Sequence, residues 1–313
     1  MEKKKQIDCF LPYSTVAMMQ SLAAQLYESG VVKNIYTLAA DVLPTEVLPQ
    51  YVRQLQTGGL LSLATMRLIA TTATADYALL YLKQGPITLG YHALERMLQV
   101  AEETGAAMVY ADHYSVEAGE TVKHPVTDYQ LGSIRDDFDF GSVVLLKTEC
   151  LKEYAAKEVA KDYQFAGWYD LRLFLSREGE LFHLNEYLYT EEEDDLRASG
   201  EKQFDYVNPR NREVQIEMEQ AATAHLSAIN ALVVTTQYAQ PDFSAEAFPV
   251  EASVVIPVFN REKTVRDAVV SALSQKTDFP FNVIVVDNHS TDGTTEILST
   301  LAADERLVHL IPT

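Results

Sequence analysis

Short apolar runs alternate with more polar stretches along the first two thirds of the chain. The runs IDCFLPY (7–13), DYALLYL (76–82) and AAMVYAD (106–112) have the length and apolar character of buried strands. Helices are predicted between them, at 14–29, where Ser14 is the expected N-cap, and at 91–104. This alternation predicts an α/β fold with a mostly parallel, Rossmann-like sheet flanked by helices.

The rest of this first region continues the pattern less regularly. The run of carboxylates Glu191–Asp195 is expected to be a solvated loop, because residues adjacent in sequence need not converge in space. The other expectations are a strand ending near Asp41, helix or loop over 45–73, a turn-rich segment over 113–139, a strand and a helix over 140–154, a helix over 166–178, strands over 181–190 and a helix over 209–231.

A second series of alternating elements begins late in the chain. Residues 235–252 contain proline, serine and alternating polarity, which is typical of a linker. Residues 253–313 then predict strand, helix, strand, helix and strand, and SVVIPVF has the apolar continuity of a strand buried on both faces. The sequence therefore predicts a domain over 1–234, a linker, and a partial second βαβ unit over 253–313.

Composition and charge narrow the classes of partner. The 313 residues include 45 acidic and 25 basic side chains, a formal charge of −20, which disfavours nucleic acid as a partner. Cys9 and Cys150 show neither metal spacing nor a disulfide framework, which favours a reducing, cytoplasmic compartment. The basic start, Lys3–Lys5, is either a solvated tail or a contact with an anionic surface at the inner face of a membrane.

The second unit places polar residues where its strands end. Asn260 and Arg261 follow the first strand, and Asp287 closes the second, NVIVVD. Ligands of open α/β sheets bind at the carboxyl ends of the strands, where a carboxylate can accept hydrogen bonds from a ribose or a base. The alternative is an ordinary βαβ unit in which Asp287 only caps the next helix.

The pattern VVIPVFN, helix, VIVVDNHSTDGT resembles the opening of family 2 glycosyltransferases, inverting enzymes of GT-A fold whose usual pattern is close to VVIPVYN, helix, IIVVDDGSTDGT. Phe259 replaces the tyrosine of that pattern, Asn288 its second aspartate and His289 its glycine. The resemblance implies a nucleotide pocket, of UDP type by our expectation, lined by Pro257, Phe259, Arg261 and Asp287.

Residues 7–190 resemble the same family more weakly, which implies a tandem arrangement. In CFLPYS, Pro12 and Tyr13 stand where the second unit has Pro257 and Phe259. Asp41 follows Pro12 by 29 positions, and Asp287 follows Pro257 by 30, so Asp41 is a weak counterpart. Where the family reads something like DYILFLDSDDIL, this chain has DYALLYLKQGPI. Lys83 then either contacts a phosphate in place of a metal or marks a lost site.

The acceptor side of the first unit also departs from the family. The position expected for the catalytic base falls on Trp168, beside Asp170. The segment RDDFDF supplies carboxylates for a metal or for sugar hydroxyls, or is simply a solvated loop. We expect Asp112 and His113 to make local hydrogen bonds, since two ligands do not complete a metal site. The acceptor-side candidates are Asp136, Asp137, Asp139, Trp168 and Asp170, with Trp168, Tyr169 and Tyr114 able to stack on sugars or to form core.

The resemblance implies sugar transfer from a nucleotide-sugar donor to a glycan or lipid-linked acceptor, assisted by Mg²⁺ or Mn²⁺. The family's metal-binding D-x-D and its base are not found here, so we expect a truncated second domain, no turnover by this chain alone, and pairing of its open sheet edge in a homodimer. The alternative is a catalytically inactive module that binds an acceptor or a partner protein. An NAD-type Rossmann enzyme is disfavoured because no G-x-G-x-x-G follows a predicted strand.

Overall fold

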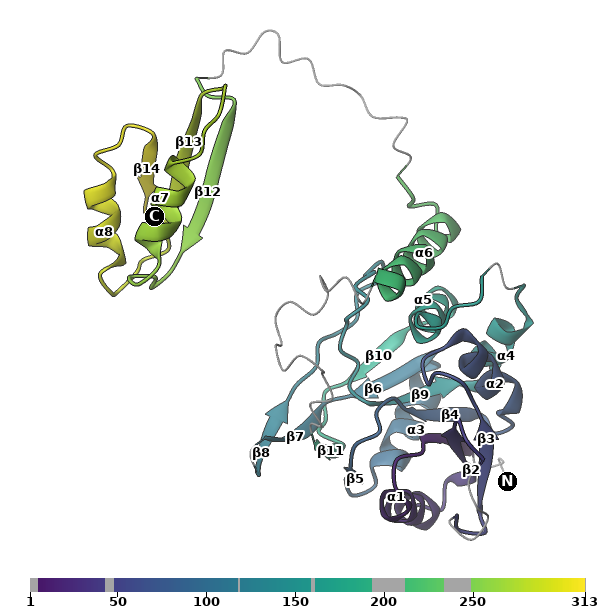
Figure 1. Cartoon of the computed structure of the whole chain (residues 1–313). Coiled ribbons are helices and arrows are strands. Elements are labelled where there is room, and N and C mark those ends of the chain that lie inside the picture. The colour runs from purple at the N-terminus through teal and green to yellow at the C-terminus, as the bar shows by residue number, and fades with distance from the viewer. Residues whose placement is uncertain are drawn as a thin grey trace. The chain divides into compact units, whose positions relative to one another are not determined.

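The structure, a computed structural model, describes residues 5–42, 48–117, 119–158, 161–192, 212–233 and 249–312. The chain divides into two compact units, Met1–Val233 (unit 1) and Val234–Thr313 (unit 2), both drawn in Figure 1. Most of the predicted linker lies outside the described residues, as does the start of the helix predicted at 209. No helix in the described ranges has the length and apolarity needed to span a membrane.

Unit 1 is built on a seven-stranded, mostly parallel sheet, which confirms the predicted α/β class. Only β9 runs antiparallel to its neighbours β4 and β6. The strands, in spatial order, are β10 (Leu181–Leu184), β6 (Met108–Ala111), β9 (Val143–Lys147), β4 (Tyr77–Tyr81), β1 (Ile7–Pro12), β2 (Val32–Ala39) and β3 (Val52–Gln56).

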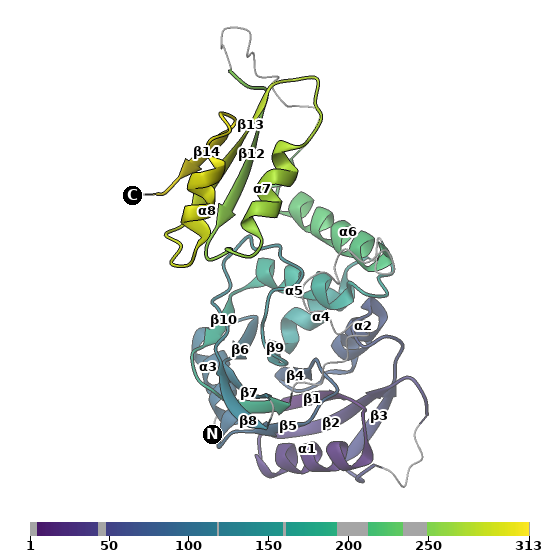
Figure 2. The ribbon, with the colours of Figure 1, turned by 60° about the vertical axis from the view of Figure 1, so that its left-hand side comes forward.

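Helices cover both faces of this sheet. On one face, α1 (Val16–Glu28) and α3 (Ala93–Thr104) pack against alternate residues of the strands. On the other face lie α2 (Leu63–Thr72), α4 (Thr148–Ala156) and α5 (Gly167–Glu178), with α6 (Arg212–Ala228) against α5. Figure 2 shows α1 on one side of the strands and α2, α4 and α5 on the other. The continuous apolar runs of β1 and β4 follow from burial on both faces.

A second, four-stranded sheet was not predicted. Its order is β5 (Ile87–Leu89), β11 (Tyr189–Glu192), β7 (His113–Glu117) and β8 (Glu120–His124). The prediction of a turn-rich segment over 113–139 is therefore wrong for its first part. The residues of β8 are largely exposed, so this strand has no apolar face to reveal it in the sequence. Strand β3, an edge strand with two apolar residues, was missed for the same reason.

Unit 2 has the predicted order of elements: β12 (Ala252–Val258), α7 (Val265–Leu273), β13 (Phe281–Asp287), α8 (Thr294–Leu301) and β14 (Leu307–Leu310). The three strands are parallel, in the order β12-β13-β14. Val265 and Val269 of α7 and Leu298 of α8 pack with Val283 and Val285 of β13, so both helices lie on one face.

The opposite face of this small sheet is uncovered within unit 2. Val255 is 59% exposed, and it pairs with Ile284, which pairs in turn with Val308, 37% exposed. The prediction that β12 is buried on both faces is therefore wrong for this unit. The apolar run is real, but two helices on one side can bury only alternate residues of a strand.

Candidate functional site

The carboxyl edge of unit 2 is formed as the sequence predicts. Val258, the last residue of β12, pairs with Asp287, the last residue of β13, so both strands end at the same edge. Three of the residues expected to line a nucleotide pocket are exposed there: Pro257, Phe259 and Arg261. Phe259 is 53% exposed, an unusual position for a large aromatic ring that does not contribute to a core.

Hydrogen bonds join the two loops at this edge. Asn260, in a left-handed conformation with φ of 52°, donates its amide to Ser290 Oγ at 3.0 Å. Its side-chain oxygen accepts from the amide of Thr291 at 2.8 Å. The amide of Arg261 donates to Thr294 Oγ1 at 2.7 Å. The backbone that presents Phe259 and Arg261 is therefore fixed by the loop that follows β13.

Asp287 holds the loop that follows β13 by hydrogen bonds. Its carboxylate is fully buried and accepts from the amide of Ser290 at 2.9 Å and from Thr295 Oγ1 at 2.5 Å. Burial alone would raise the pKa of Asp287, but the bonds from Ser290 and Thr295 lower that pKa to about 2. Neither contact is that of the capping alternative, because Asp287 accepts from no amide of α8, and this helix begins after Gly293 without a capping side chain. A direct contact between Asp287 and a base or ribose stays a prediction, and the structure gives this carboxylate an internal role.

Sequence reasoning missed the parts played by Asn260, Ser290 and Thr294 in joining the loops. A signal was present, because short polar side chains cluster in the segment NHSTDGT, where they satisfy turn backbone.

The corresponding edge of unit 1 holds a cleft of about 230 Å³. Pro12, Tyr13 and Asp41 line it together with Gln84, so three of the four weaker nucleotide-binding candidates come together. Gln84 donates to the carbonyl of Tyr13 at 3.2 Å across the cleft.

The register of the strands corrects the assignment of Asp41. Pro257 pairs with Val286, one residue before Asp287. Pro12 pairs with Leu38, so the residue in the place of Asp287 is Ala39. Asp41 lies beyond the end of β2, in an exposed loop. It is therefore not the counterpart of Asp287, because a similar spacing in sequence does not compensate for a different strand length.

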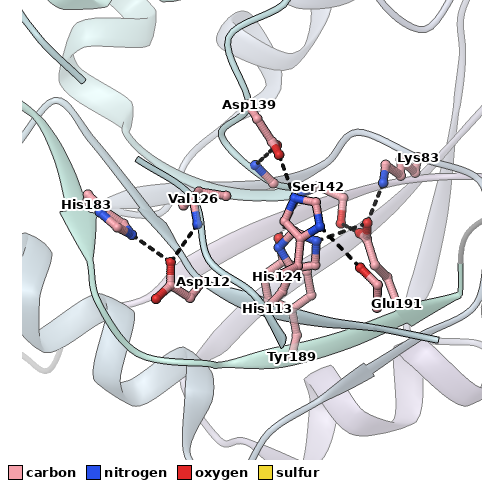
Figure 3. A network of polar contacts seen from close by, with 12 residues as sticks. Lys83, Asp112, His113, His124, Val126, Asp139, Ser142, His183, Tyr189 and Glu191 are labelled. Carbon is pink, nitrogen blue, oxygen red and sulfur yellow. Dashed lines mark hydrogen bonds and ion pairs between the residues drawn. The ribbon is translucent and has the colours of Figure 1, made fainter. Parts of the chain in front are cut away.

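Lys83, the fourth candidate, forms an ion pair with Glu191 (Figure 3). The Glu191 carboxylate is almost fully buried, whereas the Lys83 side chain is 49% exposed. His113 Nε2 lies 3.2 Å from Glu191 Oε1, and Ser142 Oγ donates to the other carboxylate oxygen. The expectation that Glu191 lies in a solvated loop is therefore wrong. Glu192, the next residue of that run, is the exposed end of β11, and residues 193–195 lie outside the described residues.

Electrostatics explain how Glu191 stays charged in the interior. Burial raises the pKa of Glu191, but hydrogen bonds from His113, Lys83 and Ser142 outweigh it and bring that pKa to about 2. The amine of Lys83 is thus already engaged at the point where the family resemblance places a phosphate or a metal. A phosphate at Lys83 would have to compete with the Glu191 carboxylate.

An aromatic stack supports the network. The ring of His113 lies between His124, at a centroid distance of 4.4 Å, and Tyr189, at 5.0 Å. The Tyr189 hydroxyl accepts from the amide of Ser142 at 2.9 Å. Gly141, with φ of +69°, lies next to that hydroxyl, on the side where a Cβ atom would project.

Asp112, which precedes His113, makes the local hydrogen bonds that we expected. It accepts from the amide of Val126 at 2.8 Å and lies 2.9 Å from His183 Nε2. Among the described residues, no three His, Cys, Asp or Glu side chains are grouped so as to hold a metal ion.

The acceptor-side carboxylates lie in separate surroundings. Asp139 contacts His124 Nε2 at 2.8 Å, and Asp137 pairs with Arg135 at 2.8 Å on the surface, next to the exposed Asp136. Asp170 accepts from the Tyr154 hydroxyl at 2.8 Å, and burial raises the pKa of Asp170. Asp137, Asp139 and Asp170 thus each have a different partner, and none of these contacts joins one carboxylate to another.

The aromatic candidates on the acceptor side divide between core and surface. Trp168 packs partly buried against the core. Tyr169 is buried and belongs to that core, so stacking of a sugar on its ring is excluded in this conformation. Tyr114 is half-buried and lies against Tyr187.

The comparisons with known proteins agree with the geometry of unit 2. Residues 253–313 match the family model "Glycosyl transferase family 2", which confirms the resemblance drawn from their motifs. Over 58 residues the chain is 40% identical to the uncharacterized glycosyltransferase YfnE of Bacillus subtilis (strain 168). That stretch is 18% of this chain and only 15% of the relative.

Among solved structures, the chain is similar to two crystal structures of S. aureus TarS 1–349. One has a TM-score of 0.42 at 13% identity; the other, in complex with UDP-GlcNAc, has a TM-score of 0.45 at 10% identity. Each similarity covers 78% of this chain and 76% of the TarS chain. The weaker family resemblance of residues 7–190 stays a prediction.

Proposed function

We propose that this protein is a glycosyltransferase-like protein whose unit 2 binds the nucleotide part of a nucleotide-sugar donor. The observation that carries the proposal is the carboxyl edge of β12 and β13, where Phe259 and Arg261 are exposed on a loop anchored by buried Asp287. The match of this segment to the glycosyltransferase family supports it. A loop fixed in advance loses little conformational entropy when it binds a ligand.

Each residue at this edge has a proposed role. The exposed ring of Phe259 offers a face on which a base stacks. The guanidinium of Arg261 offers charge and directional donors to a diphosphate. Asp287 acts through the loop, as a positioning residue, by holding the amide of Ser290 and the hydroxyl of Thr295.

The finer parts of the function follow from the family resemblance and are proposals. A protein with this function would transfer a sugar with inversion to a glycan or a lipid-linked acceptor, with Mg²⁺ or Mn²⁺ neutralising the leaving diphosphate. We propose that this chain alone binds nucleotide without turnover, that it resides in the cytoplasm, and that it forms a homodimer through unit 2.

Calorimetric titration with UDP, with and without Mn²⁺, tests the nucleotide site. We expect wild-type protein to bind UDP and Arg261→Gln to bind at least about tenfold more weakly, since a charge-assisted contact contributes about 1.5–3 kcal/mol. The matched control is Arg266→Gln, which removes the same charge from the exposed surface of α7 and should leave binding unchanged.

The other outcomes are equally informative. Binding that survives Arg261→Gln and is lost in Lys83→Gln would move the site to unit 1 and refute the assignment to unit 2. Absence of UDP binding in the wild-type protein would refute nucleotide binding by either unit.

Two observations favour a second function, that of a module binding an acceptor or a partner protein. Lys83 is bound to Glu191 where the family resemblance expects metal-binding carboxylates, and Trp168 stands at the position of the base. If this function holds, oligosaccharide acceptors will bind wild-type protein without nucleotide or metal. Mn²⁺-dependent UDP binding that requires Lys83 would exclude it.

A further inference from the structure

The edge of the unit 1 sheet opposite the cleft at Pro12 carries a hollow of about 450 Å³. It lies where β1 and β4 begin and where the antiparallel β9 ends. Four lysines line it: Lys5, Lys33, Lys147 and Lys152. Such a gathering of positive charge stands out in a chain whose formal charge is −20.

Two carboxylates also line the hollow, and each is paired. Asp76 accepts from the amine of Lys5 at 3.1 Å, and Glu149 lies 3.0 Å from that of Lys147. The amine of Lys33 donates to Thr74 at 3.1 and 3.2 Å. Within the described part of the chain, Lys33 and Lys152 have no acidic partner. The lining thus holds four ammonium groups against two carboxylates, while the buried carboxylate of Asp8 lies behind it and accepts from Thr74 and Ala75.

The amino end of α4 opens onto the same hollow. This helix, Thr148–Ala156, begins after Lys147 without a capping side chain. Its first amide, that of Thr148, donates to the carbonyl of Asp76 at 3.1 Å, so the partial positive charge at this end is offered by the amides that follow Thr148. Thr148 lines the hollow and is 4% exposed, and its Oγ1 has no hydrogen-bond partner. An unpaired buried hydroxyl costs free energy, and a ligand that bonded to it would remove that cost.

We propose that this hollow binds an anion bearing more than one phosphate charge. Phosphate oxygens accept hydrogen bonds from ammonium groups, helix amides and hydroxyls, and the hollow offers all three. The volume is within the range of small-ligand sites. The hollow lies in unit 1, at the other edge of the sheet from Pro12 and Tyr13, whereas the proposed nucleotide site lies in unit 2, so the two proposals are independent. The phosphates come either from a free anion such as pyrophosphate or from a lipid headgroup.

The experiment uses the full chain and two probes in low salt without divalent metal. Pyrophosphate is titrated calorimetrically, and vesicles of phosphatidylglycerol are compared with vesicles of phosphatidylcholine in a sedimentation assay. Lys33→Gln and Lys152→Gln each remove one ammonium group from the hollow. We expect each to weaken binding of the active probe about fivefold, the effect of one charge at contact distance in water.

The matched control is Lys123→Gln, which removes the same charge from β8, where the ammonium lies over the Tyr187 ring. It should leave binding unchanged. Thr148→Val is the sharper probe, because it removes only the unpaired hydroxyl. We expect this variant to melt at the same temperature as wild type or higher, and to bind more weakly.

The two arms separate the sources of phosphate. Pyrophosphate binding that is lost in the hollow variants assigns a free anion. Binding to phosphatidylglycerol vesicles alone, lost in the same variants, assigns a lipid headgroup. The proposal is overturned if neither probe binds, or if Lys123→Gln weakens binding as much as Lys33→Gln, which would show only a response to net charge.

Discussion

The carboxylate of Asp287 and the hydroxyl of Thr295 lie 2.5 Å apart, and this contact ties the end of β13 to the first turn of α8. Because the same carboxylate also accepts from Ser290, the loop between strand and helix closes around one buried charge. The loop in turn positions the backbone of Asn260 and Arg261.

Replacing Asp287 by alanine should loosen this loop before it affects any ligand. Two half-buried donors lose their acceptor, at a cost of up to about 1–3 kcal/mol for each donor left unsatisfied. We expect faster amide hydrogen exchange at Ser290 in Asp287→Ala and no change in Asp278→Ala, a variant in an exposed loop of the same unit. Unchanged exchange at Ser290 would contradict the anchoring role.

The depressed pKa of Asp287 fixes the sign of a pH dependence. The pKa of Asp287 is about 2 in the folded protein and about 4 in the unfolded chain. The ionised carboxylate therefore contributes its full stabilisation of the folded loop above about pH 4. This stabilisation is lost as the pH falls through about 2. Exchange at Ser290, corrected for the intrinsic rate, should therefore accelerate between pH 4 and 2 in wild type but not in Asp287→Ala.

Glu191→Gln should destabilise unit 1, because it leaves His113 and Lys83 without the charge that they surround. Breaking a buried ion pair lowers the free energy of unfolding by about 3–5 kcal/mol. Because Lys83 is half-exposed, we expect Glu191→Gln to have an effect near the lower end of that range. The matched control is Glu192→Gln, the exposed neighbour on the same strand, which should leave the unfolding free energy unchanged. Denaturant unfolding measures both, and equal effects would refute the special role of Glu191.

Gly141→Ala should lower the free energy of unfolding by more than the strain of its backbone conformation alone explains. The added methyl group would overlap the Tyr189 hydroxyl, in addition to the strain of a positive φ. Gly105→Ala is the control, since its φ of +68° matches the +69° of Gly141 and its surroundings are open. We expect about 1 kcal/mol for Gly105→Ala and about 2–4 kcal/mol for Gly141→Ala.

A double-mutant cycle with Tyr189→Phe isolates the contact at Gly141. Removing the hydroxyl should make Gly141→Ala less costly than it is in the wild-type background, leaving mainly the strain of the left-handed conformation. If Gly141→Ala costs the same in both backgrounds, the overlap with Tyr189 is not what limits this position.

The sequence predicts best what depends on burial along single elements. The strands β1, β4 and β6 and the helices α3 and α5 were found because apolar runs and helical spacing reflect their surroundings directly. The antiparallel direction of β9 was not foreseen, since a strand buried on both faces has the same pattern in either direction.

The network around Glu191 was not predictable from local pattern. Glu191 is the first of five adjacent carboxylates, and its partner Lys83 lies 108 positions earlier in the chain. Only the pairing of β11 with β7 brings Glu191 under His113. At unit 2 the motif placed Asp287 at the correct strand end. It did not reveal that the carboxylate accepts a hydrogen bond from the loop that follows it.

Self-association through unit 2 gives the last prediction. We expected a homodimer through the open sheet edge, and the adjoining uncovered face carries Val255, Val308 and Leu310. Burying one valine contributes about 1.5 kcal/mol, and a twofold dimer buries two copies. Val255→Lys should therefore lower the average mass measured by light scattering at high protein concentration. Val270→Lys, on the exposed surface of α7, is the control and should not. A wild-type protein that stays monomeric at every concentration, or equal effects of both variants, would show that this face is not a contact between copies.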